Sequence, residues 1–398
     1  MRWNYYTVNC RKSVRMQNKD LKIEPQLTRY MYSKASRAGI PLGGTFELTP
    51  LCNFRCRMCY IRKTPEEVKA HSRPCMTLDQ WLEIAVEARK AGMLYLLLTG
   101  GEPFLWPDFW PLYEELSRMG FLISINSNGS MIDEETVERL KKMPPTRINI
   151  TLYGFGDGAY ERLCGAPEGF AKTANAIRML QEAGIMVKLN GSLTPDNAAD
   201  LEACIAYAQE RGLIYETSTY MFPPIRRDAQ MTGRNERFTP EEAAGYRLKS
   251  YRLQFGEEKY RQYLENIDKG YVPPMGVDQS CTDPVDGKIR CRAGNASFWV
   301  TWDGWLTPCG LMTEPKADLY REGFTDAWQE LTKECAALKL SGVCAKCPDQ
   351  KLCHACAAMA EAETGSPSGI PSYLCETVIA LKKMATQELA RMRETTRR

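Results

Sequence analysis

Apolar positions follow two alternating patterns between residues 44 and 220. Short runs that are apolar at nearly every position, such as residues 94–98, predict strands that are buried on both faces. Longer segments carry apolar residues three and four positions apart and predict amphipathic helices. Six strands are predicted in this region, at residues 45–49, 94–98, 121–126, 147–152, 186–190 and 213–219.

Helix-end signals lie between these strands. Thr77 and Gln80 form a capping-box pattern, and Gly92 stands just past the end of the same helix. Thr194 and Pro195 are typical of an N-cap and a first helical residue. Five helices are predicted, at residues 78–91, 109–119, 134–142, 170–183 and 195–211.

The alternation of strands and helices predicts an α/β fold with a parallel sheet and right-handed crossovers. Six units are too few to close an eight-fold barrel, so we expect a partial (β/α)6 TIM-like barrel. Its working face should be the edge at which the strands end, because active sites of such barrels lie there.

The rest of the chain divides around this barrel. A short helix is predicted near residues 25–38, and a polar helical segment follows the last strand. Nine cysteines then fall within 95 residues, which predicts a small cysteine-rich C-terminal domain. The expected parts are a lead-in (1–43), the barrel (44–222), a helical connector (223–280), the cysteine-rich domain (281–375) and a closing helix (376–398).

Composition narrows the class of protein. The 398 residues are 44% hydrophobic and 25% charged with a net charge of +3, so nothing indicates nucleic acid or a membrane surface as partner. No run approaches the roughly 18 apolar residues of a membrane span, and the N-terminus lacks the apolar stretch of a signal peptide. We therefore expect a cytoplasmic protein.

The cysteine count changes this ordinary picture. In a reducing compartment, 16 cysteines indicate ligands of metals or iron–sulfur clusters rather than disulfides. The chain has only two histidines, His71 and His354. Acid–base chemistry that rests on histidine, and a histidine-rich zinc site, are therefore both disfavoured.

Cys52, Cys56 and Cys59 directly follow the first predicted strand with the spacing C-x3-C-x2-C. Three thiolates can bind three irons of a [4Fe–4S] cubane and leave the fourth iron open for a substrate or cofactor. The alternative is a zinc knuckle with a remote fourth ligand. The position of the motif at the working edge of the barrel favours the iron–sulfur cluster.

Further segments at successive strand ends accompany this motif. Together with the cysteines they resemble the radical S-adenosylmethionine (SAM) superfamily, over roughly residues 44–222. The matching segments are Tyr60, Gly100-Gly101-Glu102-Pro103 after the second strand, Asn126-Ser127-Asn128-Gly129 after the third, Thr151-Leu152-Tyr153-Gly154 after the fourth, and Asn190 at the end of the fifth. Tyr153 stands where the family usually has an aspartate.

The resemblance implies both a cofactor and a mechanism. SAM would chelate the open iron and be cleaved by one electron to methionine and a 5′-deoxyadenosyl radical, which abstracts a hydrogen atom from the substrate. The catalytic group would be the iron–sulfur cluster on Cys52, Cys56 and Cys59. The implied SAM-binding residues are Tyr60, Gly100, Gly101, Glu102, Pro103, Asn126, Ser127 and Asn190.

The C-terminal cysteines resemble the SPASM extension of radical SAM enzymes, which carries two auxiliary [4Fe–4S] clusters. A strand–turn–strand hairpin around Asp303-Gly304 would present one of these cysteines, Cys309. The resemblance assigns one auxiliary cluster to Cys281, Cys291, Cys309 and Cys356, and the other to Cys344, Cys347, Cys353 and Cys375.

The C-terminal pattern departs from the family at one spacing. Only His354 and Ala355 separate Cys353 from Cys356, where the family usually has three residues, so the partner of Cys356 stays open. A pair of zinc ribbons is the alternative for this segment. Among the other cysteines, we expect Cys204 in the core. Cys164 lies in a loop that faces the active-site end, and we expect it to be inert; the alternative is that it donates a hydrogen atom or holds a substrate.

The resemblance implies a substrate class. Relatives with this architecture mostly crosslink, epimerise or oxidise ribosomal peptides or proteins, with an electron donor such as a flavodoxin or ferredoxin. Alternatives are tetrapyrrole or other small-molecule chemistry, a sulfatase-maturase-like oxidation, and a non-catalytic iron–sulfur scaffold. Gly310 follows Cys309 at the position where sulfatase-maturing relatives have an aspartate that acts as a base. This difference disfavours a sulfatase-maturase-like oxidation. A complete set of SAM motifs argues against the scaffold.

Overall fold

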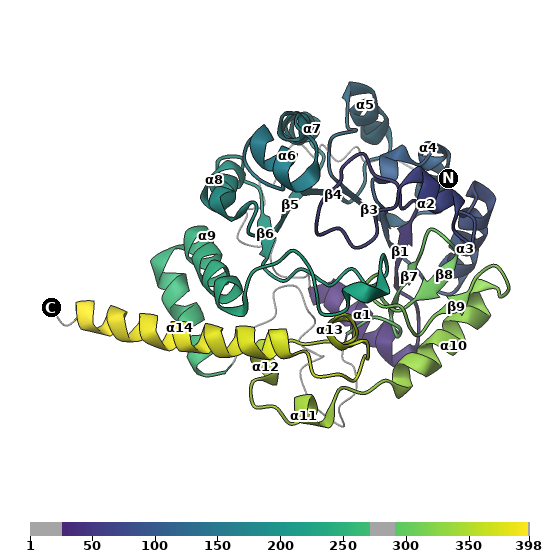
Figure 1. Ribbon diagram of the computed structural model, residues 1–398. Coiled ribbons are helices and arrows are strands. Elements are labelled where there is room, and N and C mark those ends of the chain that lie inside the picture. The colour runs from purple at the N-terminus through teal and green to yellow at the C-terminus, as the bar shows by residue number, and fades with distance from the viewer. Residues whose placement is uncertain (1–25, 271–290, 397–398) are drawn as a thin grey trace, which may run out of the picture.

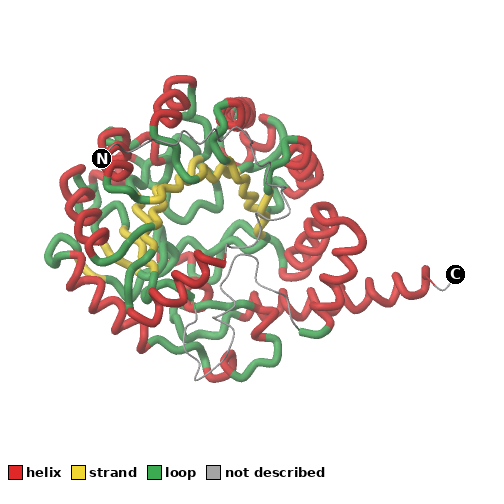
Figure 2. The backbone as a smooth tube through the Cα atoms, turned by 180° about the vertical axis from the view of Figure 1, so that it is seen from behind, coloured by secondary structure: helices red, strands yellow, loops and turns green. Residues whose placement is uncertain are grey.

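The computed structural model describes residues 26–270 and 291–396 (Figure 1). Parallel strands curve into an arc with helices along its outer side, so the expected partial barrel is confirmed (Figure 2). The strands run in the order β6-β5-β4-β3-β2-β1 across the sheet. Their bounds are β1 Gly43–Glu47, β2 Tyr95–Thr99, β3 Leu122–Ser127, β4 Arg147–Thr151, β5 Val187–Ser192 and β6 Tyr215–Ser218.

All five expected barrel helices are present. The Thr77 side chain accepts from the backbone N–H of Gln80, and the Gln80 side chain accepts from the backbone N–H of Thr77, as the capping box predicts. These helices are α3 Leu78–Lys90, α4 Phe109–Arg118, α5 Glu134–Lys142, α7 Gly169–Glu182 and α8 Leu201–Glu210.

Two local expectations were wrong. The segment after β4 is not a plain loop, because it forms the helix α6 (Asp157–Cys164). The last barrel helix does not begin at Pro195. The backbone N–H of Thr194 donates to Asn197 Oδ1 at 2.8 Å, which makes a turn there and delays the helix until after η2 (Ala198–Asp200).

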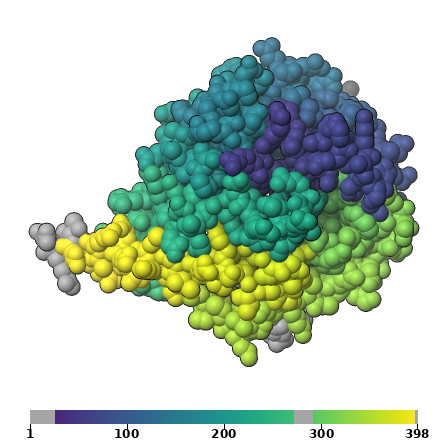
Figure 3. All heavy atoms as spheres, in the orientation of Figure 1, coloured from purple at the N-terminus to yellow at the C-terminus, as the bar shows by residue number. Residues whose placement is uncertain are grey.

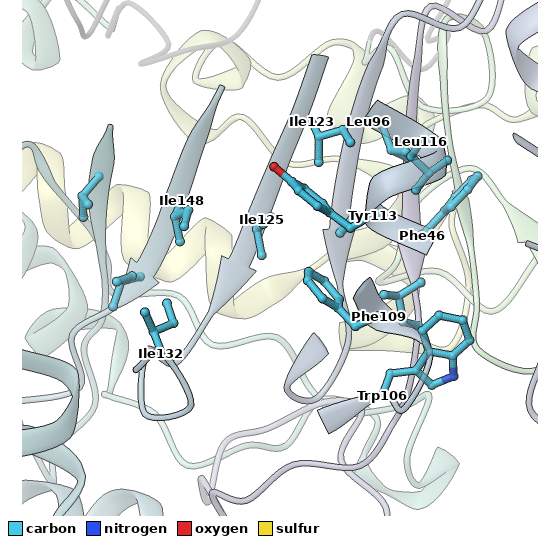
Figure 4. Close-up of a cluster of buried hydrophobic side chains, with 14 of the residues drawn as sticks. Phe46, Leu96, Trp106, Phe109, Tyr113, Leu116, Ile123, Ile125, Ile132 and Ile148 are labelled. Carbon is cyan, nitrogen blue, oxygen red and sulfur yellow. The ribbon is translucent and has the colours of Figure 1, made fainter. Parts of the chain in front are cut away.

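Strand alternation separates an apolar face from a polar one. Apolar side chains on the convex face pack against α4 in one continuous core (Figure 4). The strands contribute Phe46, Leu96, Ile123, Ile125 and Ile148, and α4 contributes Phe109, Tyr113 and Leu116. The concave face is polar instead, because Asn126, Asn149 and Lys188 lie at one level on β3, β4 and β5.

The cysteine-rich region continues the barrel sheet. Strand β7 (Ser297–Val300) pairs in parallel with the free edge of β1, and β8 (Trp305–Thr307) returns antiparallel to it. This is the hairpin expected around Asp303-Gly304. With β9 (Ala317–Asp318), the sheet formed by the described residues has nine strands. Pairing satisfies backbone groups that the edge of β1 would otherwise expose.

The C-terminal half packs below the barrel. Helix α9 (Pro240–Asp268) kinks at Gly256 (φ 76°). Helix α14 (Ser372–Thr396) packs along α9, and its last turns project from the body (Figure 3). The remaining helices are α1 Gln26–Ala38, α2 Pro65–Lys69, η1 Pro103–Leu105, η3 Ala229–Met231, α10 Phe324–Ala337, α11 Gly342–Ala345, α12 Gln350–Cys353 and α13 Ala357–Thr364. Throughout residues 26–270 and 291–396, none of the helices has the length and hydropathy needed to cross a membrane.

A buried ion pair joins the barrel to this C-terminal part. Glu47, at the end of β1, has no exposed surface and accepts two hydrogen bonds of 2.8 Å from Arg226. Trp299 of β7 donates to the same carboxylate at 2.9 Å. Arg226 also donates to the carbonyl of Gly310 at 2.7 Å, so four separate segments meet at one pair of charges.

Arg226→Met should destabilise the protein by about 3–5 kcal/mol, because it leaves the buried Glu47 carboxylate without its counter-ion. The free energy of unfolding in urea measures this. Arg178→Met is the control, since Arg178 and Glu182 form a pair whose side chains are 54% and 62% exposed. Its effect should stay within about 0.5 kcal/mol. Equal effects of the two substitutions would contradict the anchoring role of Arg226.

Candidate functional site

The loop from Cys52 to Cys59 leaves the end of β1 and is held by α6. The backbone N–H of Arg55 donates to the carbonyl of Cys164 at 2.7 Å, and that of Arg57 to Leu163 at 3.1 Å. The last carbonyls of a helix have no partner within the helix, so the end of α6 is a natural acceptor for this loop. The helix that the sequence analysis missed therefore fixes the path of the cysteine motif.

The three thiols of the loop share one largely apolar pocket, which also contains Phe54, Tyr153 and Tyr160. Burial raises the pKa of Cys52 to about 12, and burial and the neighbouring Cys56 raise the pKa of Cys59. Hydrogen bonds from Cys164 and Tyr153 lower the pKa of Cys56. The three thiols therefore belong to one apolar cluster. Thiols in such a setting become thiolates when a metal neutralises them.

The ligand set of the loop is three thiols at C-x3-C-x2-C spacing. A [4Fe–4S] cubane takes cysteine thiolates on its separate irons. Cys52, Cys56 and Cys59 could therefore hold three irons and leave the fourth without a protein ligand.

The glycines after β2 have a packing role. A Cβ on Gly100 would lie 2.6 Å from the carbonyl of Thr49, and one on Gly101 would lie 2.3 Å from that of Leu51. The backbone N–H of Gly101 donates to Thr49 at 2.7 Å, and that of Glu102 to Leu51 at 2.9 Å. Side chains here would separate the β2 loop from the start of the cysteine loop.

Glu102 connects the β2 loop to the end of β3 through hydrogen bonds. It is fully buried and accepts from the hydroxyl of Ser127 at 3.0 and 3.1 Å and from the backbone N–H of Asn128 at 2.9 Å. Burial raises its pKa to about 7. Two residues expected to bind SAM, Glu102 and Ser127, thus bind each other and tie the β2 loop to the end of β3. Pro103 follows as the first residue of η1.

The other expected SAM-binding residues border the same edge. Asn126 accepts a hydrogen bond of 2.8 Å from Asn149, and Asn190 pairs in register with Thr151 on the concave face. Tyr60 is half-buried, and its pKa is raised by burial and by the negative charge of Glu47. Residues near the ends of β1 to β5 thus lie along the edge of the sheet from which the cysteine loop leaves β1.

Sequence reasoning missed two residues of this pocket. Cys164 was expected in a loop, but it ends α6 and is fully buried in the pocket of the three thiols. Tyr160, Leu163 and Cys164 repeat at helical spacing, which could have revealed α6. The second residue is Asn128, whose side chain donates to Cys52 Sγ at 3.7 Å. Cys204 is 2% exposed and lies in the core, as expected.

The C-terminal cysteines fall into two neighbourhoods. Burial and the nearby Cys356 raise the pKa of Cys309 to about 11, and both residues border one apolar patch. Burial and the other three members raise the pKa of Cys353 to about 11 in the second set, which is Cys344, Cys347, Cys353 and Cys375. Cys309 and Cys356 are two members of the first expected set, and the other four cysteines are the second set; the ligand roles of both sets stay a prediction. Cys291 is described, whereas Cys281 lies outside the described residues.

Comparison with known proteins gives this geometry a context. Residues 46–208 match the family model described as the Radical SAM superfamily. The AdoMet-dependent heme synthase of Methanosarcina barkeri is 24% identical over 333 residues, or 80% of this chain and 92% of that protein. The Bacillus subtilis protein AlbA, of antilisterial bacteriocin subtilosin biosynthesis, is 23% identical over 368 residues, or 89% of this chain and 75% of its own length.

The fold is shared with a solved structure. Streptococcus suis SuiB, in its crystal structure with the precursor peptide SuiA, superposes with a TM-score of 0.62 at 18% identity. The superposition covers 88% of this chain and 80% of SuiB. At this identity the likeness shows the fold alone.

Replacing Cys52, Cys56 and Cys59 together with alanine should lower the iron content from about 12 to about 8 atoms per chain after anaerobic reconstitution, if three cubanes are present. Iron and sulfide analysis measures this. A Cys75→Ala/Cys204→Ala double variant, which removes thiols from outside all three sets, should keep about 12. A fall from about 4 to none, with zinc bound, would mean that the C-terminal cysteines hold zinc.

The stability of the metal-free chain should fall as the pH rises through the pKa of Glu102. The folded-state pKa of about 7 lies above the ordinary value of 4.5, so the folded chain holds the extra proton between these values. Relative to Glu102→Gln, the wild type should lose about 2–3 kcal/mol between about pH 5 and about pH 8. Urea unfolding at several pH values measures the difference. If the free energies of unfolding of wild type and Glu102→Gln changed with pH in parallel, Glu102 would not be the source of the pH dependence.

Proposed function

We propose that this chain, which carries a radical SAM domain in residues 46–208, abstracts a hydrogen atom from a ribosomally made peptide or protein and thereby modifies it. Enzymes of this superfamily use a [4Fe–4S] cluster and SAM. The observation that carries the proposal is the extent of the likeness. AlbA and SuiB resemble this chain over 89% and 88% of its length, well beyond the matched domain and into the cysteine-rich region.

Each group of residues has a part in this proposal. Cys52, Cys56 and Cys59 would hold the SAM-binding iron–sulfur cluster, which supplies the electron that cleaves SAM to the hydrogen-abstracting 5′-deoxyadenosyl radical. Glu102 holds the β2 loop against the end of β3, and apolar side chains pack around the thiols. SAM would lie over this edge, near Tyr60, Gly100, Gly101, Pro103, Asn126, Ser127 and Asn190.

The cysteine-rich region would complete the reaction. Two auxiliary clusters, on Cys281, Cys291, Cys309 and Cys356 and on Cys344, Cys347, Cys353 and Cys375, would accept the second electron of a net oxidation. The bond from Arg226 to Gly310 supports this role, because it holds the residue beside Cys309 to the end of β1. A flavodoxin or ferredoxin in the cytoplasm would supply the first electron.

The concave face supports a peptide substrate. Its middle is lined by the amides of Asn126 and Asn149 and by the ion pair of Lys188 with Glu216. Amides and charges can hydrogen-bond a peptide backbone, whereas a tetrapyrrole ring calls for broad apolar surface.

Haem formation is the second candidate. It rests on the heme synthase of M. barkeri, whose alignment covers 92% of that protein.

A synthetic, uniformly deuterated peptide, corresponding to a short reading frame beside the gene, should transfer deuterium to 5′-deoxyadenosine when the reconstituted enzyme is reduced with SAM. Mass spectrometry of both products measures the transfer. Cys52→Ala should abolish it by more than about 100-fold, since the radical requires the iron–sulfur cluster.

The outcomes separate the two candidates. Deuterium in 5′-deoxyadenosine together with a changed peptide mass supports peptide modification. If SAM is cleaved without deuterium transfer from such peptides, and an added tetrapyrrole is converted to haem, the second candidate replaces the proposal. An absence of reductive SAM cleavage with either substrate would contradict both.

A further inference from the structure

Asn128 touches the pocket of the three thiols. Its Nδ2 donates to Cys52 Sγ at 3.7 Å and to Asn53 Oδ1 at 2.9 Å. The residue follows the end of β3 and is 5% exposed. Both hydrogens of the amide group therefore have partners on the cysteine loop.

The orientation of this amide is fixed by its neighbours. Ser130 donates to Asn128 Oδ1 twice, from its backbone N–H at 2.8 Å and from its hydroxyl at 2.6 Å. The backbone of Asn128 donates to Glu102 at 2.9 Å and accepts from the hydroxyl of Thr173 at 2.9 Å. Since a backbone N–H can only donate, the oxygen must face Ser130 and the NH2 group must face Cys52.

Cys164 makes the corresponding contact on a second sulfur. It packs in the same pocket as Cys56, and its own carbonyl holds the backbone of Arg55 at 2.7 Å. The side chain has no exposed surface, so it cannot reach a substrate or serve as its hydrogen donor. Its thiol faces Cys56, and an S–H group can donate a weak hydrogen bond to a thiolate.

The side chain of Tyr153 also donates to Cys56. The other donors to these sulfurs come from the backbone. Phe54 donates its N–H to Cys52 Sγ at 3.4 Å, and Arg62 donates to Cys59 Sγ at 3.4 Å. Substitution of a side chain leaves these bonds in place. Asn128 and Cys164 are two side-chain donors on which a substitution can test the effect of hydrogen bonding while Tyr153 stays in place.

Hydrogen bonds to cysteinyl sulfur act on the reduction potential of an iron–sulfur cluster. Reduction adds one negative charge, part of which resides on the sulfurs, so a donor stabilises the reduced state more than the oxidised state. Burial in an apolar pocket acts in the opposite direction, because it disfavours added charge. The pocket around Cys52, Cys56 and Cys59 combines both influences.

We propose that Asn128 and Cys164 are positioning residues that donate hydrogen bonds to Cys52 and Cys56 and so raise the reduction potential of the iron–sulfur cluster that these cysteines hold. The proposal rests on the ligand roles given under the proposed function. It adds that this chain sets its potential from two different elements, the end of β3 and the end of α6.

The test is a redox titration of the reconstituted enzyme without SAM, followed by electron paramagnetic resonance. The signal of interest is the one that disappears in the Cys52→Ala/Cys56→Ala/Cys59→Ala variant. Cys164→Ala and Asn128→Leu should each shift its midpoint potential to more negative values. Cys164→Ser keeps a donor and should stay near the wild type. Cys204→Ala is the matched control, because it removes an equally buried thiol from the core, and it should shift nothing.

Iron content separates the outcomes. Full iron with unchanged midpoint potentials in Cys164→Ala and Asn128→Leu would overturn the inference and leave the proposed function intact. A shift in Cys164→Ser as large as in Cys164→Ala would overturn the part of Cys164, because the donor is then irrelevant. If the triple cysteine variant keeps all its iron, the proposed ligand roles fail and this inference fails with them.

Discussion

The site depends on one geometric constraint, which is that three thiols must face a common space while the loop that carries them has no regular structure of its own. The loop obtains its shape from its neighbours. The end of α6 accepts two of its backbone N–H groups, and the β2 loop packs against its start at Gly100 and Gly101. Glu102 then ties that β2 loop to the end of β3. Because each support comes from the carboxyl end of the barrel, the fold itself places the thiols at the edge where barrel enzymes react.

A second constraint joins the two halves of the chain. The cysteine-rich region continues the barrel sheet through β7, and the buried pair of Glu47 and Arg226 holds the segment beside Cys309 against the end of β1. A buried charge pair adds little net stability over apolar packing, but it penalises any arrangement that separates the partners. The pair therefore favours one relative position of Cys309 and the barrel edge. This is what a reaction shared between two iron–sulfur centres would require.

The sequence predicted most of the barrel because its strands are buried on both faces and its helices carry clear end signals, such as Thr77 and Gln80. The sequence-based prediction failed at α6 and at the start of α8. Thr194 looks like an N-cap, but the side chain of Asn197 accepts a hydrogen bond from the backbone N–H of Thr194, and α8 begins further along the chain. The short helix α6 was hidden between Gly154 and Gly165, and with it the place of Cys164. The cysteine motif could be predicted from spacing alone. The partners of its sulfurs, Asn128 and Cys164, lie 76 and 108 positions beyond Cys52 and Cys56 in the sequence, and only the fold brings them there.

The central claim is that Cys52, Cys56 and Cys59 hold a cubane whose fourth iron is open to SAM. Electron–nuclear double resonance on the reduced enzyme, with SAM labelled with nitrogen-15 at its amino group, tests it most directly. The account predicts a hyperfine coupling between this nitrogen and the iron–sulfur cluster, which disappears in the triple cysteine variant. Bound SAM without any such coupling would mean that no iron of this centre is open to it, and the account would be wrong.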